Sequence, residues 1–173
     1  MKMEQPTGGI KSVVFASLPA TLAGFEALPQ AALQSPYDTA ALFVVALNAW
    51  QHNRDECVGM INLLKGPEPL NRNDINFLAE RMADKATYLA NSYFKGATPK
   101  NNYAPAEPFT VVIGDNPHSF AVQNVAKLFV NCGGADSPRP ISMRLAKDGK
   151  WCLWEYSSIL VGIRPPESTN PWA

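Results

Sequence analysis

The hydrophobic pattern divides the chain into a helical half, about residues 18–95, and a strand-rich half, about residues 108–164. In the first half, apolar residues recur every three or four positions, which is the period of one helix face. In the second half they form short runs or alternate with polar residues, as strands do. The proline- and asparagine-rich stretch GATPKNNYAPAEP connects the halves. We therefore expect an α+β fold, with N-terminal helices packed on a C-terminal antiparallel sheet of four or five strands.

The strongest predicted helix begins after Ser35 and ends near Trp50. Ser35 can cap its first turn, and Pro36 suits its first position. The body, TAALFVVALNAW, is apolar on nearly every side, which is typical of a helix buried at the centre of a domain. The predicted core residues on this helix are Leu42, Phe43, Val45, Ala46 and Leu47.

Three shorter helices each show one apolar face. The first covers residues 20–28, with Thr21 as its predicted N-cap. The second is expected to begin at Asp55, whose carboxylate suits an N-cap. The third follows Asn71, with Asp74 at the position of a capping box.

Short β-prone segments supply the sheet. The four main predicted strands are residues 109–113, 125–132, 141–145 and 151–156, and residues 10–16 at an edge and residues 159–163 are the two candidates for a fifth. Asp148-Gly149 is the signal of a type I′ turn, so the strands on either side of it are expected to form a hairpin.

The strand that follows this turn carries aromatic residues on both faces. Trp151 points to one side, and Trp154 and Tyr156 point to the other. If the helices cover the Trp151 side, then Trp154 and Tyr156, joined by Phe129, form an exposed aromatic patch that suits a peptide, a sugar or a partner protein. The alternative is that both faces of the sheet are covered.

The loop GGADSPRP, residues 133–140, is the second candidate site. Consecutive glycines can direct backbone N–H groups at an anion. Arg139 stands between two prolines, and a guanidinium held in this way suits a carboxylate or phosphate, with Asp136 and Ser137 beside it. The alternative is a purely structural loop in which the glycines make the turn, Asp136 and Ser137 cap it, and Arg139 pairs with Asp136.

This loop, followed by DGKW at residues 148–151 and WE at 154–155, resembles a bacterial domain family of unknown function. Other segments fit the same pattern in the same order: LP at 18–19, LPQ at 28–30, LKGP at 64–67, SYF at 92–94 and GATP at 96–99. The resemblance covers most of the chain. It implies a bacterial source and a compact domain, and it assigns no activity, cofactor or site residue.

Composition and charge exclude several classes of protein. The 173 residues are 46% hydrophobic and suit one globular domain over 1–173 with a mobile tail at 165–173. Fifteen basic residues balance fifteen acidic ones, so no overall field favours nucleic acid. No stretch has the apolar length of a membrane span. The apolar run VVFASLPA is interrupted by Pro19 and does not predict a secretion signal, so we expect a cytoplasmic protein.

The three cysteines, Cys57, Cys132 and Cys152, form no CxxC motif. Three buried thiols in a reducing compartment are the expected state, and a Cys132–Cys152 disulfide between neighbouring strands is the alternative. No spacing typical of a metal site or a nucleotide-phosphate loop occurs, so we expect no metal and no cofactor.

Three hypotheses about function follow. The first is a non-enzymatic binding module that uses the GGADSPRP loop and the aromatic sheet face to hold a protein partner or a second copy of itself. The second is a small-ligand enzyme, with a pocket between helices and sheet that holds His118, Asp136 and Arg139. The third is a structural domain that self-associates through the Trp154 face.

Overall fold

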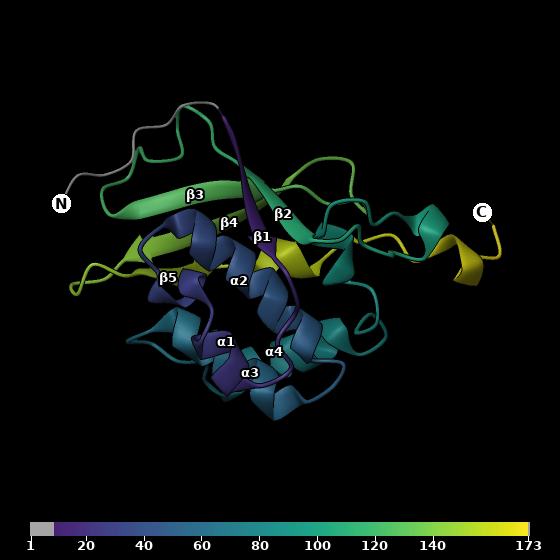
Figure 1. Cartoon of the computed structure of the whole chain (residues 1–173), viewed down its shortest axis with the longest axis horizontal. Helices are drawn as coiled ribbons and strands as arrows, with labels where there is room; N and C mark the ends of the chain where they lie inside the picture. Colours follow the sequence, from purple (N-terminus) through teal and green to yellow (C-terminus); the bar gives the residue numbers. More distant parts are fainter. Residues whose placement is uncertain (1–8, 173) are drawn as a thin grey trace.

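A computed structural model describes residues 9–172 and confirms the α+β class. Five strands form one antiparallel sheet in the order β1-β2-β3-β4-β5, and the four α-helices lie together on one side of it (Figure 1). The strands are β1 (Ile10–Phe15), β2 (Phe109–Gly114), β3 (Val125–Val130), β4 (Arg139–Leu145) and β5 (Trp151–Glu155). The helices are α1 (Leu22–Glu26), α2 (Pro36–Ala49), α3 (Arg54–Lys65) and α4 (Arg72–Met82). Short 3-10 turns are η1 (Pro29–Ala32), η2 (Asn91–Tyr93), η3 (Pro99–Asn101), η4 (Ser157–Leu160) and η5 (Glu167–Thr169).

In the sequence, the helical half of the chain lies between β1 and β2, which are neighbours in the sheet. β1 pairs with β2 over its whole length, from Ile10 opposite Gly114 to Phe15 opposite Phe109. β2 to β5 then follow as a meander of antiparallel neighbours. The predicted edge strand near the N-terminus is therefore confirmed, at the β1 end of the sheet.

Helix α2 forms the centre of the molecule and contacts all five strands. All of its residues are buried except Asp38, so its nearly continuous apolar sequence has the predicted role. Five residues were predicted from the sequence to lie in the core, and each is completely buried: Leu42, Phe43, Val45, Ala46 and Leu47.

Three of the predicted helix caps are confirmed, and one is wrong. Thr21 caps α1, Ser35 caps α2, and Asn71 forms the capping box of α4. Asp55 does not cap α3. Its own N–H group donates to the side chain of Asn53, which is the actual cap, because the Asn53 side-chain oxygen, two residues earlier, accepts the free N–H groups of Asp55 and Glu56.

The β4–β5 hairpin is present, but its turn is not type I′. The Gly149 N–H donates to the Ala146 carbonyl at 3.0 Å. Gly149 has a positive φ of 90°, whereas Lys147 and Asp148 between the bonded residues do not. A type I′ turn needs positive φ at both central positions, so the turn belongs instead to the three-residue class that ends in a left-handed glycine.

The predicted strand at 159–163 is absent, and η4 stands in its place. Ile159 and Leu160 are both completely buried, which two successive strand residues on opposite faces of an edge strand would not be. The hydroxyl of Tyr93 donates to the Ile159 carbonyl at 2.6 Å and fixes this turn in the core.

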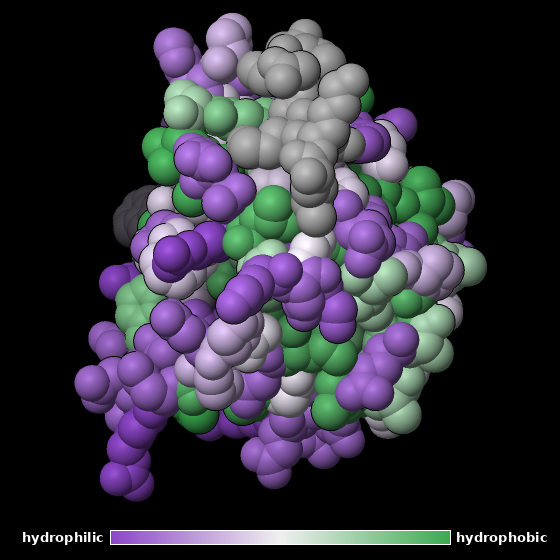
Figure 2. All heavy atoms as spheres, turned by 90° about the vertical axis from the view of Figure 1, so that its left-hand side faces the viewer, coloured by the Kyte–Doolittle hydropathy of each residue, from purple (hydrophilic) through white to green (hydrophobic). Residues whose placement is uncertain are grey.

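The helices cover only one face of the sheet, here called the inner face. On the strands, residues such as Val111, Leu128 and Met143 point inward and are buried. The opposite, outer face carries partly or fully exposed residues, and among residues 9–172 no helix lies over it (Figure 1). At the hairpin end of the molecule, hydrophobic side chains reach the surface as patches between polar ones (Figure 2). No helix in the described part of the chain is long and apolar enough to cross a membrane.

Candidate binding groove beside Trp154

Trp154 lies on the outer face of edge strand β5 and is 43% exposed. The guanidinium carbon of Arg144, from the neighbouring strand β4, lies 4.6 Å from the centre of its ring. Side chains of one strand alternate between the two faces, and the pairing of Arg144 with Cys152 puts Arg144 and Trp154 on the same side. The two form a ridge, held by a cation–π contact.

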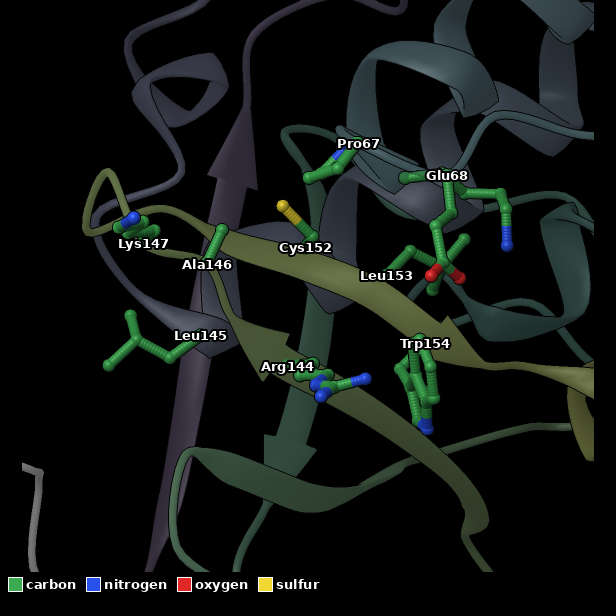
Figure 3. A pocket seen from close by; sticks show the side chains of 10 residues that line it. Pro67, Glu68, Arg144, Leu145, Ala146, Lys147, Cys152, Leu153 and Trp154 are labelled. Carbon is green, nitrogen blue, oxygen red and sulfur yellow. The ribbon is translucent and has the colours of Figure 1, made fainter.

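A groove of about 280 Å³ runs beside this ridge. The β4–β5 hairpin forms its floor, and the segment that follows α3 forms the opposite wall (Figure 3). Glu68 and Trp154 stand toward one end, and Lys147 stands at the other (Figure 3). The groove is lined by Lys65, Pro67, Glu68, Arg144, Leu145, Ala146, Lys147, Cys152, Leu153 and Trp154. We call it the Trp154 groove.

Gly66 brings the wall of the Trp154 groove against the edge strand. It ends α3 with a positive φ of 64°, a conformation that glycine adopts without strain. A Cβ atom at this position would lie 2.7 Å from the sulfur of Cys152, so any side chain would push the wall away from β5. The close approach leaves Cys152 7% exposed, and burial raises the pKa of its thiol.

A second groove, of about 310 Å³, lies on the other side of the ridge. It is lined by Val122, Gln123, Asn124, Val125, Arg144, Leu145 and Trp154. The carbonyl of Asn124 accepts the Leu145 N–H at 2.8 Å and ties this wall to β4. Arg144 and Trp154 therefore project between two hollows.

The charges around the Trp154 groove are mainly positive. Lys65, Arg144 and Lys147 line it, against the single carboxylate of Glu68. Lys65 places its ammonium 5.7 Å from the ring centre of Tyr156. Within residues 9–172, no carboxylate forms a salt bridge with Arg144.

Tyr156 does not share the outer face with Trp154, which corrects the predicted aromatic patch. It is 8% exposed, and its ring centre lies 5.0 Å from that of Phe43 on α2. The alternation of faces fails here because β5 ends at Glu155, before Tyr156. Burial, with a smaller effect of the Asp74 and Glu155 carboxylates, raises the pKa of Tyr156 to about 12.

The two glycines of the GGADSPRP loop permit close packing. A Cβ atom on Gly133 would overlap the carbonyl oxygen of Ala97, and one on Gly134 would overlap the hydroxyl of Tyr103. The Gly133 N–H donates to the Ser92 carbonyl at 2.7 Å. Because this N–H is already satisfied, it is not available to an anion.

The three predicted ligand-binding residues of this loop do not converge. Asp136 is exposed and pairs with Arg164, not with Arg139. Ser137 is also exposed. Arg139 starts β4 on the same side as the buried Ile141, and its Nη2 donates to the Gly162 carbonyl at 3.0 Å. A shallow groove of about 360 Å³ between the loop and residues 92–98 includes Asp136 and Ser137 and lacks Arg139.

The structure does not bring together the residues of the enzyme hypothesis. His118 is exposed in the β2–β3 connection. The next residue, Ser119, accepts the Lys127 N–H at 2.9 Å, near the start of β3. Asp136 follows the opposite end of that strand, and Arg139 faces Gly162. Within residues 9–172, no group of three or more His, Cys, Asp or Glu side chains is placed to hold a metal ion.

The predicted alternative of a Cys132–Cys152 disulfide is wrong, since all three thiols are free. The Cys132 sulfur lies 3.3 Å from the hydroxyl oxygen of Ser92, whereas Cys152 lies beside Gly66. Cys132 follows the end of β3 and Cys152 lies on β5, and β4 separates these two strands in the sheet.

Fold and surface together define an α+β domain whose antiparallel sheet has one face covered by helices and, within residues 9–172, one face with no helix over it. Residues 17–167 match the model of a family described as Domain of unknown function (DUF6935), and the chain belongs to that family. No curated protein and no solved structure matches the chain. The family description leaves the function open, so any proposed role has to come from the surface itself.

Proposed function

We propose that this protein is a non-enzymatic binding module that docks a segment of another protein on the outer sheet face, over the Arg144–Trp154 ridge. One observation carries the proposal: a tryptophan that is 43% exposed and held in place by a stacked arginine, between two grooves. Tryptophan and arginine are enriched among the residues that dominate binding energy at protein interfaces.

Arg144 and Trp154 are held in place by the strands that carry them, which lowers the entropic cost of binding a partner. Both residues stand on hydrogen-bonded strands, and neither has to be drawn from a flexible loop. Each side chain that a complex must immobilise costs about 0.5–1.5 kcal/mol, so a side chain already held by stacking loses less. The open face therefore presents a preorganised contact.

The GGADSPRP loop has a smaller part in this proposal than the sequence predicted. Its glycines are accounted for by close packing, and Arg139 is turned toward Gly162. We further propose that this loop is a signature of the family. The same proposal includes a bacterial source and a cytoplasmic location. The free thiols favour a reducing compartment.

A peptide selection tests the proposal. A random peptide library displayed on phage is selected on the intact protein, and the recovered peptides are measured against Trp154→Ala. We expect a loss of about tenfold or more in affinity, because the central contact is removed. The control is Trp172→Ala, which removes an equally large side chain that is 91% exposed outside the groove, and which should bind as the wild type does.

Peptides that bind Trp154→Ala as tightly as the wild type, or a selection that yields no peptide dependent on Trp154, would contradict the proposal. Sedimentation velocity over a range of concentrations examines the structural alternative. Self-association of the wild type that Trp154→Ala abolishes would make a second copy of this chain the occupant of the face.

A further inference from the structure

We infer that the partner segment is acidic: an extended peptide that pairs a carboxylate with Arg144 and places the neighbouring apolar side chain in the Trp154 groove. This inference rests on the proposed binding role and specifies its partner. It follows from the charges around the groove, the state of Arg144, and the size and shape of the hollow.

The charges around the Trp154 groove indicate that the partner segment is negatively charged. Three cationic side chains and one carboxylate line the groove, although the whole chain has a net charge of zero. The excess is therefore local. Complementary charges across an interface speed association and exclude partners of the wrong sign, so a negatively charged segment is favoured over a neutral or basic one.

The state of Arg144 indicates that the anionic group of the partner is a carboxylate. Its guanidinium packs against Trp154 at 4.6 Å, and no carboxylate within residues 9–172 neutralises it. The planar guanidinium presents a fork of N–H donors that matches the two oxygens of a carboxylate. Stacking limits the orientations of that fork, which makes it a better partner for a carboxylate than a freely rotating lysine.

The lining and the volume of the Trp154 groove fit one apolar side chain of the partner. Its floor and one wall are built from Leu145, Ala146, Cys152, Leu153 and Pro67. Its volume of about 280 Å³ lies just below the range of about 300–1,000 Å³ that is typical of small-molecule sites. The lining follows successive residues of β4 and β5, so the hollow runs along the strands (Figure 3). This shape suits an extended peptide, whose side chains point alternately into the groove and away from it.

Synthetic peptides test the inference. The first alternates aspartate and leucine over nine residues and has blocked ends. The second replaces each aspartate by asparagine, and the third replaces each leucine by serine. Binding is followed by NMR titration of the indole N–H of Trp154 and the Nε–H of Arg144. We expect the first peptide to bind at least about tenfold more tightly than either of the others.

Variants of the groove give the second readout. Arg144→Gln should weaken binding of the Asp-Leu peptide by about five- to tenfold, because it removes the charge and the fork of donors. Glu68→Gln should strengthen it by about two- to threefold, because it removes the opposing carboxylate of the wall. The matched control is Lys100→Gln, an exposed cation in η3 outside the groove, which should leave the affinity unchanged.

The outcomes separate this inference from the proposal beneath it. If the asparagine peptide binds as well as the aspartate peptide, and both need Trp154, the acidic partner is overturned and the binding role stands. If the Asp-Leu peptide is displaced by inorganic phosphate at matched ionic strength, the site recognises phosphate and the carboxylate assignment fails. If neither these peptides nor any selected by phage display depend on Trp154, both the inference and the proposed function are overturned.

Discussion

The side-chain hydroxyl of Thr39 donates a buried hydrogen bond of 2.6 Å to the carbonyl oxygen of Trp151. Thr39 lies on the central helix α2, and Trp151 is the first residue of edge strand β5. The N–H of Trp151 is taken by the carbonyl of Leu33 at 2.8 Å. The helical half therefore provides hydrogen-bond partners for both the N–H and the carbonyl of Trp151. These two bonds fix the edge strand that carries Trp154.

Replacing Thr39 by valine should destabilise the protein by about 1–3 kcal/mol. Valine matches the shape of threonine, but it leaves the buried carbonyl of Trp151 without its donor, and a buried unsatisfied group costs about that much. Urea denaturation at neutral pH measures the loss. Thr110→Val is the control, because its hydroxyl bonds the Pro108 carbonyl at an exposed site and should change stability by less than about 0.5 kcal/mol. Equal stability of the two variants would contradict the role given to Thr39.

The substitution Gly133→Ala should cost about 3 kcal/mol or more. Its Cβ atom would overlap the backbone carbonyl of Ala97, and a backbone atom cannot move aside as the end of a side chain can. Thermal denaturation measures the effect. Gly114→Ala is the matched control, since the nearest atom to its Cβ lies at an ordinary 3.7 Å. A tolerated alanine at 133 would mean that the glycine serves something other than packing.

Replacement of Tyr156 by alanine should lower mainly the stability of the protein, whereas replacement of Trp154 should lower mainly its binding of peptides. Tyr156→Ala removes a ring packed on Phe43 in the core and should cost about 3 kcal/mol. Trp154→Ala loses mainly the contact with Arg144 and should cost about 1 kcal/mol or less. Urea denaturation of both variants checks this. A large loss of stability for Trp154→Ala would make its ring a structural element and weaken the proposed binding role.

Stability should fall as the pH rises above about 9. Burial raises the pKa of Cys57 from 9.0 to about 12. The folded thiol keeps its proton where the unfolded chain has lost it, so stability is complete below pH 9 and declines between 9 and 12. The slope contributed by one proton is at most about 1.4 kcal/mol per pH unit. The tyrosines Tyr103 and Tyr156, whose pKa values burial raises to about 12, add to the decline above pH 10.

Denaturant unfolding at several pH values measures this slope. Cys57→Ala provides the comparison: the variant is less stable at neutral pH because the side chain is smaller, but its stability should fall less steeply above pH 9. Parallel pH profiles for the variant and the wild type would show that the Cys57 thiol does not control the decline.

Local signals were sufficient for much of the fold. Ser35 and Pro36 mark the start of α2 through the needs of its first turn. The apolar body that follows predicts a central helix without knowledge of what surrounds it. The five strands that form and the hairpin were likewise predictable, since they depend on neighbouring residues and on a pattern of period two, whereas the strand predicted at 159–163 is replaced by η4.

The candidate sites depended on contacts between residues distant in the sequence. From the sequence, Gly133 and Gly134 were expected to bind an anion or to make a turn, but they are small because Ala97 and Tyr103 lie against them. Arg139 reads as a residue of the loop, yet pairing of β4 turns it toward Gly162. No local pattern records these approaches.

The sequence by itself determined the α+β class, the central helix and the strand character of the segment that forms β1, because propensity, capping and periodicity act over a few residues. Tertiary structure alone decided which aromatic residue faces outward. Trp154 and Tyr156 have the same parity in the sequence, but β5 ends between them, and Tyr156 turns into the core against Phe43. The wall that completes the Trp154 groove comes from the segment after α3, which is far from the β4–β5 hairpin in the sequence. Its position follows from packing of Gly66 on Cys152, which only the folded chain creates.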